Sequence, residues 1–548
     1  MPSLVLGPLL RYVGETEAVL WVETDSECEV EILGSRERTF CVCDHHYALV
    51  CCGDLEPGTW HEYEVLLDGE RVWPQDDGFP ASAFRTYPKG TPLKIVFGSC
   101  RVAAPHEPPY TLRKDEDPRG REIDALHTMA LQMRDQPRQD WPDVLLMLGD
   151  QVYADEVSPA TLAFIETKRD TDEKPGERVL DFDDYTQLYL ESWGEPAIRW
   201  LLSTVSTAMI FDDHDVHDDW NISEAWLREA RSHEWWNEHI KAALASYWVY
   251  QHLGNLPPEA HRDDRLLKQV KEADDAEDLL EAFAFHADRE NEGTRWSYCR
   301  DLGSTRLIVI DSRAGRVLEE GRRSMLDDDE WDWVHEHATG GFDHLLIGTS
   351  LPWLLGRGMH YTEAWSEAVA GGAWGPVAAR GAEKIRQAAD MEHWAAFQEG
   401  FARVLDMVVE VAEGKRGRPP GTITFLSGDV HNSYVTEIDR QELGPGASRI
   451  VQAVCSPIRN PLPRGVRVAQ SLLARGLNRP LQFLVDRSTK VPSAPYNWRV
   501  TQGPWFDNNL ATLQVRGRGL VLRWDAGVVE GENYDEPELR QVARVVLQ

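Results

Sequence analysis

Short apolar runs that stop at clusters of polar residues are the most regular pattern in the sequence. Residues 144–148 form such a run, which ends at Gly149 and Asp150. An apolar run of this length bounded by glycine predicts a buried strand, and loops at strand ends often carry chemistry. Several strands that bring Cys, Tyr, Asp and His to one sheet edge predict a site for more than one metal ion. The pattern recurs at residues 93–98, 207–211 and 422–427, and more weakly at 342–348.

Residues 1–88 follow a different pattern. Apolar and polar residues alternate over short stretches such as 18–23 and 60–65, and turn-forming residues separate them at 55–59 and 68–69. Alternation with period two, interrupted by turns, predicts an all-β domain. About seven short strands would form an immunoglobulin-like sandwich. No residue of this segment suggests catalysis, so a docking or shielding role is expected.

Helical periodicity lies between the strand signals in the rest of the chain. Residues 160–300 are largely helical, with several Trp residues, and predict a helical insertion. Its charged segment 262–292 is expected to cover the core as a lid. Strands that alternate with helices predict an α/β fold. We therefore expect a catalytic domain over residues 93–530 and a C-terminal tail over residues 531–548. Further helices are predicted at 121–136, 327–338 and 384–411.

The composition narrows the range of partners. The 548 residues are 42% hydrophobic and 27% charged, as in ordinary globular proteins. A formal net charge of -35 argues against binding to nucleic acid or to an acidic membrane surface, where Lys and Arg supply most of the affinity. The first residues lack a secretory signal, and no run approaches the roughly 18 apolar residues of a membrane span. These features predict a cytoplasmic protein, and they leave its oligomeric state open.

The polar clusters favour a pair of different metal ions. Asp, His and Tyr bind hard and borderline cations, whereas a Cys thiolate favours a transition metal. One pocket with Cys, Tyr and His would suit a transition metal, and a neighbouring pocket of carboxylates would suit a second divalent ion. A hydroxide held between two such ions is nucleophilic at neutral pH, and a phosphate ester is the substrate best matched to it.

Four motifs in this order resemble those of a known enzyme family. Residues 149–153 (GDQVY), 212–215 (DDHD) and 428–431 (GDVH) are similar to the metal motifs of the alkaline phosphatase D, or PhoD-like, family of calcineurin-like metallophosphatases. Ser99 and Cys100 are similar to that family's first motif, in which Cys replaces an aspartate-and-histidine pair. The resemblance covers roughly residues 90–530. It implies an α/β sandwich of two stacked sheets flanked by helices.

The resemblance also implies a set of metal ligands. Asp150 corresponds to the carboxylate that bridges an Fe(3+) and a Ca(2+) ion, although other divalent metals are alternatives. Asp212 and Asp213 compete for one ligand position. The implied ferric ligands besides Asp150 are Cys100, Tyr153 and His431, and the implied calcium ligands are Asp213 and Asp429.

Further residues are expected to meet the substrate. His214 corresponds to a histidine that faces the phosphoryl group, where it would stabilise the transition state or protonate the leaving alkoxide. Arg101 is a candidate phosphate contact because a guanidinium matches phosphate geometry, and a structural role beside the loop is the alternative. Asn432 would orient His431, contact phosphate or form a turn. His360, Glu363 and Trp365 fall where relatives build a substrate rim.

The expected activity is hydrolysis of phosphomonoesters, phosphodiesters or both, by attack of a metal-bridging hydroxide. A phosphodiesterase or phospholipase-type hydrolase with little monoesterase activity is an alternative on the same fold. A noncatalytic protein that grips a partner with the Trp-rich insertion is an alternative of another class, although the complete set of ligands argues against it. The expected partner is a small-molecule phosphate ester. Exported members of the family carry a secretion signal, and its absence here leaves open an intracellular esterase acting on a nucleotide, lipid or other phosphodiester.

Overall fold

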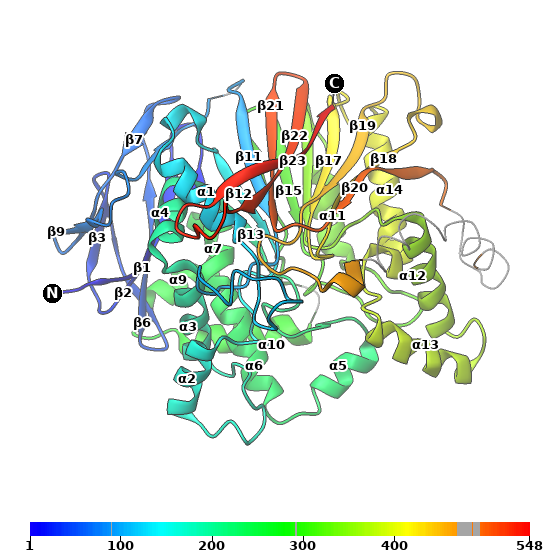
Figure 1. Cartoon of the computed structure of the whole chain (residues 1–548), viewed down its shortest axis with the longest axis horizontal. Coiled ribbons are helices and arrows are strands. Elements are labelled where there is room, and N and C mark those ends of the chain that lie inside the picture. Colours follow the sequence, from blue (N-terminus) through cyan, green and yellow to red (C-terminus); the bar gives the residue numbers. More distant parts are fainter. Residues whose placement is uncertain (89, 291–292, 468–484, 486–493, 548) are drawn as a thin grey trace.

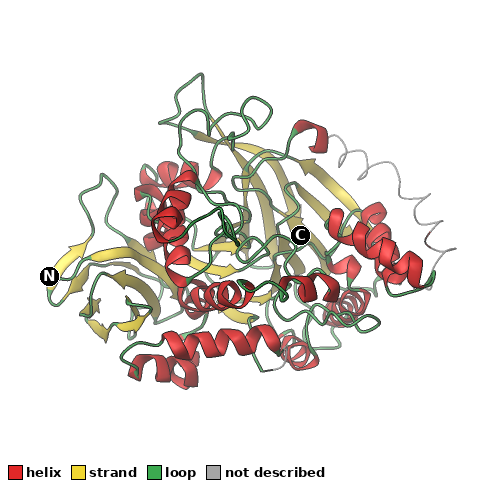
Figure 2. Cartoon of the chain, turned by 90° about the horizontal axis from the view of Figure 1, so that it is seen from below, coloured by secondary structure: helices red, strands yellow, loops and turns green. Residues whose placement is uncertain are grey.

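Two β-sheets packed face to face form the centre of the chain in the computed structural model (Figure 1). The structure describes all residues except 89, 291–292, 468–484, 486–493 and 548. The two sheets approach closely at Gly348, where an added Cβ would lie 3.3 Å from the Leu148 side chain of the opposite sheet. The layers therefore run helix, sheet, sheet, helix, as the resemblance implied (Figure 2).

The first sheet combines early strands with strands from the end of the chain. Its first three members are parallel, and β21 joins them to an antiparallel C-terminal meander. Residues 538–547, which lie in the segment expected to be a tail, pair with β22 as an edge strand. That expectation was wrong because charged and polar residues interrupt the apolar ones over this stretch, so it lacks the regular alternation of a strand. In sheet order the strands are β13 (Ser206–Ile210), β12 (Val144–Leu148), β11 (Leu93–Gly98), β21 (Asn509–Arg516), β22 (Gly519–Val528) and β23 (Glu538–Leu547).

The second sheet has a parallel centre and antiparallel edges. Four neighbouring strands, β15, β16, β17 and β19, run parallel, so their carboxyl ends lie at one edge. In sheet order the strands are β14 (Tyr298–Leu302), β15 (Thr305–Ile310), β16 (His344–Thr349), β17 (Thr422–Ser427), β19 (Arg449–Val454), β18 (Ser433–Ile438) and β20 (Trp498–Trp505).

Helices cover the outer face of each sheet. On the first sheet α1 (Ala125–Arg134) packs against β21, β22 and β23, and α4 (Pro196–Thr204) packs against β13. On the second sheet α11 (Asp328–His337) and α14 (Gln398–Ala412) bury apolar faces against the strands. The helix expected at 384–411 is instead two helices, α13 (Pro376–Ala388) and α14, separated by a turn. The segment before them, expected only to be rich in glycine, contains α12 (Arg357–Ala370).

The first 85 residues form the expected β domain. Two four-stranded sheets, in the orders β1-β2-β6-β5 and β4-β3-β8-β9, make a sandwich, and β7 and β10 form a separate pair. The strands are β1 (Leu4–Val13), β2 (Ala18–Thr24), β3 (Glu29–Ile32), β4 (Ser35–Arg38), β5 (Phe40–Val42), β6 (His45–Cys52), β7 (Trp60–Glu62), β8 (Val65–Leu67), β9 (Glu70–Trp73) and β10 (Ala83–Arg85).

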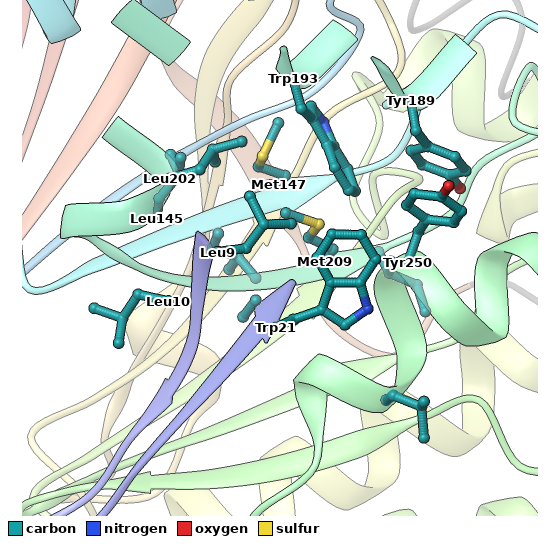
Figure 3. Packing of buried hydrophobic residues seen from close by; sticks show 14 of the residues in the cluster. Leu9, Leu10, Trp21, Leu145, Met147, Tyr189, Trp193, Leu202, Met209 and Tyr250 are labelled. Atoms are coloured by element: carbon teal, nitrogen blue, oxygen red, sulfur yellow. The ribbon is translucent and has the colours of Figure 1, made fainter. Parts of the chain in front are cut away.

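The N-terminal domain shares one hydrophobic core with the first sheet and the helical insertion (Figure 3). Leu9 and Trp21 of the β domain belong to the same buried cluster as Met147 of β12, Met209 of β13 and Tyr250 of the insertion. The Trp-rich insertion is therefore core rather than a free arm. Its helices are α2 (Pro159–Lys168), α3 (Phe182–Trp193), α5 (Glu224–Ala230), α6 (Trp236–Tyr247), α7 (Leu253–Asn255), α8 (Pro258–Asp263), α9 (Arg265–Glu272) and α10 (Glu277–Arg289), and a π-helical turn (Trp248–His252) precedes α7.

Candidate metal centre

The loops after β11, β12, β13 and β17 meet at one edge of the sandwich. They approach so closely that two glycines are required. A Cβ on Gly149 would lie 2.5 Å from the Cβ of Asp212, and a Cβ on Gly428 would lie 2.0 Å from the Ser99 hydroxyl of the opposite sheet. The loop after β11 is hydrogen-bonded to the loop after β12 through the amide of Cys100 and the carbonyl of Gly149, 3.3 Å apart.

Residues in these loops have an unusual backbone conformation. Cys100, Asp150, Asp429 and His431 all have positive φ, between 49° and 62°. L-residues pay roughly 1–2 kcal/mol for the left-handed region, so such residues persist only where the surrounding structure holds them, and they cluster at functional sites. Each of the four was expected from sequence to be a metal ligand.

Two groups of ligand atoms share one carboxylate. The donor atoms of Cys100, Asp150 and His431 all lie within 4.8 Å of one another, and so do those of Asp150, Asp212 and Asp213. Asp150 belongs to both groups. The first group offers sulfur, oxygen and nitrogen, which suits a transition metal, and the second offers oxygen alone, which suits a harder cation.

The chemistry of these groups fits bound cations. Both carboxylate oxygens of Asp150 and Nδ1 of His431 are buried without a hydrogen bond to any described residue. Burial and the neighbouring charges of Asp213 and Asp212 raise the pKa of the Asp150 carboxyl well above its usual range. Burial and the charges of Asp150 and Asp429 likewise raise the pKa of the Cys100 thiol. Without a cation such groups take up protons, so they can be ionised together only with positive charge between them.

Asp215 joins two of the loops. Its carboxylate accepts hydrogen bonds from the amides of Asp150 at 2.9 Å, Gln151 at 3.2 Å and Val152 at 3.3 Å, and from that of Asp212 at 2.9 Å. The side chain is buried, so these bonds are shielded from water. Asp215 therefore fixes the backbone on both sides of the shared carboxylate.

The contacts of Arg313 distinguish Asp212 from the adjacent Asp213. Its Nε binds Asp212, its Nη2 lies 3.1 Å from Asp213 Oδ1, and the same Nη2 donates to Glu392 at 2.8 Å. Asp212 is fully buried in this ion pair. Asp213 also lines the neighbouring cavity, and it is therefore the better placed of the two to meet an ion and a substrate.

His214 lies beside both groups. Its Nδ1 is 2.9 Å from Asp155 Oδ1, and its ring centroid is 4.7 Å from that of Tyr153. Burial lowers the pKa of His214, but the charges of Asp155 and Asp213 outweigh burial and raise it well above 6.5. The protonated imidazole is thus stabilised next to the shared carboxylate.

A cavity of about 350 Å³ opens onto these residues. Asn432, for which contact with phosphate was one of three expected roles, lies in its wall. The wall combines the polar residues Asp213, His214, Asp218, Asp219, Asp390, Glu392, His393, Asp429, His431 and Asn432 with the apolar residues Leu355, Met359, Leu462, Val500 and Pro504.

Sequence comparison identifies the family. Residues 128–483 match the sequence model of the PhoD-like phosphatase family, and residues 1–84 match a family described as a domain of unknown function (DUF7800). The chain belongs to the PhoD-like phosphatase family. The match spans the loops that carry Asp150, Asp213 and His431, and the loop of Cys100 precedes it.

Structure comparison supports the same fold for this PhoD-like phosphatase. A solved structure described as "Structure of PhoD" aligns with 99% of this chain and 90% of its own, with a TM-score of 0.57 and 12% sequence identity. No curated protein matches the chain in sequence. None of the described helices is both long enough and apolar enough to cross a membrane.

Several residues expected at the substrate of this phosphatase have other contacts. The Arg101 guanidinium is buried, forms an ion pair with Asp124 at 2.9 Å and donates to the Ser192 carbonyl at 2.8 Å. These contacts leave it a structural residue, the alternative considered above. Residues 262–292 were expected to form a lid, but none of the described residues of this segment lines the 350 Å³ cavity.

The expected rim residues on α12 also lie behind the cavity wall. His360 is buried against Phe401 and Trp498, and Trp365 packs edge-to-face on Trp374. Glu363 is fully buried and 2.8 Å from His393 Nδ1. These three residues are absent from the cavity lining over the described part of the chain, because α12 turns His360 and Glu363 toward the protein interior and the half-buried Trp365 toward the exposed Trp374.

Two residues of the phosphatase site were missed from sequence. Arg313 follows β15 by three residues, so the strand-end pattern could have found it if it had been applied to that strand as well. His393 faces the cavity, with Nε2 at 4.0 Å from Asp429 Oδ2. It escaped notice because the helix expected over 384–411 would have placed it on a regular helical face.

Tyr153 stands between the centre and a second cavity. Its hydroxyl accepts a hydrogen bond from Asn460 Nδ2 at 3.1 Å, and burial together with the charges of Asp150 and Cys100 raises its pKa. A cavity of about 390 Å³ opens on its other side, with Arg119 and Arg121 in its wall.

Proposed function

We propose that this PhoD-like phosphatase is a metal-dependent phosphoesterase that hydrolyses phosphomonoesters, phosphodiesters or both. One observation carries the proposal: the Asp150 carboxylate belongs to two adjacent ligand groups, and both of its buried oxygens have no hydrogen bond to a described residue. A carboxylate in that position is what a two-metal phosphoesterase requires.

The donor sets support an iron site beside a calcium site. Cys100, Tyr153 and His431 would complete the first with Asp150, and Asp213 and Asp429 would complete the second. When bound, such a pair supplies a nucleophile from water and positive charge beside the phosphoryl oxygens, without a covalent enzyme intermediate.

The surrounding residues would then act on the substrate. The protonated His214, held by Asp155, is in position to stabilise charge on the phosphoryl group or to protonate the leaving alkoxide. Arg313 forms ion pairs with both Asp212 and Asp213, and so fixes the orientations of these two adjacent carboxylates. The six carboxylates of the cavity wall would repel an anionic substrate unless cations were bound, which ties substrate binding to metal loading.

The cavity supports a small organic ester as substrate. Leu355, Met359 and Val500 offer apolar contact for a leaving group next to the polar floor. The net charge of -35 disfavours nucleic acid as the physiological partner. A comparison of rates on nitrophenyl phosphate and bis-nitrophenyl phosphate separates a monoesterase from a phosphodiesterase or phospholipase-type enzyme.

The decisive test is Asp150→Asn with Asp54→Asn as its matched control. Asp54 is an exposed residue with φ of 56°, close to the 52° of Asp150, so both substitutions make the same chemical change on the same backbone conformation. Asp150→Asn should lower phosphatase activity by at least about 100-fold and reduce the iron content, because a shared ligand is lost. Asp54→Asn should change neither.

Unchanged activity in folded Asp150→Asn protein would contradict the proposed mechanism. Purified protein that holds no metal, even after reconstitution with iron and calcium, would favour the noncatalytic alternative.

A further inference from the structure

A second cluster of metal-binding side chains lies away from the candidate centre. Its members are His106, in the loop after β11, His127 of α1, and Glu195 at the start of α4. Their donor atoms lie within 4.8 Å of one another. None of the three belongs to either ligand group around Asp150, and none lines the 350 Å³ cavity.

Each imidazole faces a different oxygen of the same carboxylate. His127 Nδ1 lies 2.9 Å from Glu195 Oε1, and His106 Nε2 lies 3.2 Å from Glu195 Oε2. Ligands at 2.0–2.1 Å from a tetrahedral zinc ion are separated by about 3.3 Å, so the observed spacing needs little adjustment to surround an ion. The two imidazole rings are stacked, with centroids 3.6 Å apart.

The Glu195 side chain contacts the two histidines of this cluster and does not cap its own helix. It occupies the N-cap position of α4, yet its side chain makes no capping hydrogen bond. Glutamate is not a preferred N-cap residue, and a cap contributes about 1 kcal/mol where one forms. The carboxylate contacts the two histidines instead, which indicates that the position is specified by the cluster.

The protonation states suit metal ligands. Burial raises the pKa of Glu195, but contacts with His106 and His127 outweigh burial and lower it well below its usual value, so the carboxylate is ionised. Burial lowers the pKa of His106, and contact with Glu195 only partly offsets this. Two arginines lie nearby, and both pair with Asp124, Arg101 at 2.9 Å and Arg459 at 3.9 Å.

We propose that His106, His127 and Glu195 form a separate site for one divalent transition-metal ion, with zinc as the best-matched ion. Two imidazoles and one carboxylate are a known zinc ligand set that leaves a fourth position for water. His106 and Glu195 are 25% and 28% exposed, so an ion can enter from solvent.

A metal ion bound at this site would hold in place the loop that forms one wall of the 390 Å³ cavity. Arg459 already holds this loop beside His106 through the carbonyls of Ala104 and Pro105. The same loop carries Tyr110, Arg119 and Arg121 to the 390 Å³ cavity. An ion that joins the loop to α1 and α4 would stabilise this wall.

The test counts bound zinc in the full-length protein. Wild-type protein is compared with His106→Asn, His127→Gln and Glu195→Gln, each saturated with zinc at micromolar free concentration, dialysed and analysed for zinc and iron. The wild type should hold one zinc more than each variant, with equal iron. The control is His286→Asn, because His286 pairs with Glu290 on an exposed helix surface, with no third ligand among the described residues, and the variant should bind zinc as the wild type does.

A second measurement follows thermal unfolding in zinc. Zinc should raise the Tm of the wild type and of His286→Asn by several degrees more than that of the three variants. Equal zinc content in the wild type and in every variant that keeps the native circular dichroism spectrum would overturn the proposal and leave the cluster an ion pair. Iron content and phosphatase activity report on the Asp150 centre, so failure of either proposal is recognised separately.

Discussion

At the scale of single residues, the candidate centre depends both on its metal ligands and on the residues that hold those ligands in position. Asp215 makes no contact with the cavity, but four backbone amides bind its carboxylate. These bonds use both oxygens of the buried carboxylate, so one side chain holds two loops in position.

Asp215→Asn should therefore weaken the centre. An amide has one acceptor oxygen in place of two. Either the amides of Asp150 and Asp212, which share Oδ2, or those of Gln151 and Val152, which share Oδ1, would lose their partner, at a cost of about 1–3 kcal/mol. We expect a lower Tm and a fall in kcat of at least about tenfold. Chemical denaturation and steady-state kinetics measure the two effects, and Asp54→Asn is the control. Full activity with unchanged stability would contradict the positioning role.

His393 and Glu363 form another pair with a measurable consequence. Burial lowers the pKa of His393, but the charge and hydrogen bond of Glu363 outweigh burial and raise it. Glu363→Gln removes the charge while keeping the shape, so the pKa of His393 should fall. If the protonated His393 assists the substrate, the alkaline limb of the pH–rate profile should move down by about one pH unit. A superimposable profile would show that His393 does not titrate in the reaction.

The residues that sequence revealed and those it missed differ in one physical respect. The residues found from sequence closely follow apolar runs; they are Asp150, Asp213, Asp429 and His431. Parallel strands bring their carboxyl ends to one edge of a sheet, so such residues can be found without knowing how the sheets pack. His393 depends on a break between two helices, and its position is set by tertiary packing. The rim expected at His360, Glu363 and Trp365 depends on packing in the same way, because the orientation of α12 decides which of its faces meets the cavity, and these three residues are not in the described lining.

At the scale of elements, pairs of segments distant in sequence are joined by buried polar contacts. His45 of β6 bridges Glu23 of β2 and Asp183 of α3, each at 3.2 Å. Burial lowers the pKa of His45, but the hydrogen bonds to Asp183 and Glu23 outweigh burial and raise it to about 9. The contact connects the N-terminal domain to the insertion.

The contribution of His45 to stability should depend on pH. Its pKa is raised on folding, so the stabilisation is fully present below about pH 6.5 and is lost as the pH rises through about 9. The free energy of unfolding of the wild type should exceed that of His45→Gln by about 1–3 kcal/mol at pH 6, and the difference should shrink toward pH 10. Urea unfolding at both pH values measures it. A difference that is constant with pH would show that the imidazole is neutral in the fold.

At the scale of the whole molecule, the β domain and the catalytic core should unfold together. Arg11 of β1 is buried in the insertion, where it donates to the carbonyls of Tyr250 at 2.8 Å and Gln251 at 2.7 Å. Gly254 permits this, since a Cβ there would lie 2.1 Å from Arg11 Nε. The shared hydrophobic cluster makes the same connection with apolar groups.

Arg11→Met should lower the stability of both parts. Two buried carbonyls lose their donors, at a cost of about 2–4 kcal/mol in all. We expect one calorimetric transition in the wild type and in the variant, shifted to lower temperature in the latter. Arg71→Met is the control, because Arg71 pairs with Glu64 on the exposed surface of the same domain. A separate transition of the β domain at the unshifted temperature would contradict a common core.

The fold class and the domain order could be predicted from sequence because strand runs and alternation are local signals. The edge strand β23 could not, since half-exposed strands with charged residues look like loops until a partner strand is known. The ion pair that buries Arg313 among Asp212, Asp213 and Glu392 was equally hidden, because it joins three distant loops.

The pairing of β11 with β21 sets the order of events during synthesis. Residues 93–98 leave the ribosome long before residues 509–516, yet the two segments are neighbours in the first sheet. Until the later segment emerges, β11 has an unpaired edge that other chains can pair with, and closure of so long a loop is slow. Nascent chains should therefore depend on chaperones that shield this edge, and the candidate centre, whose Cys100 follows β11, can be loaded with metal only late.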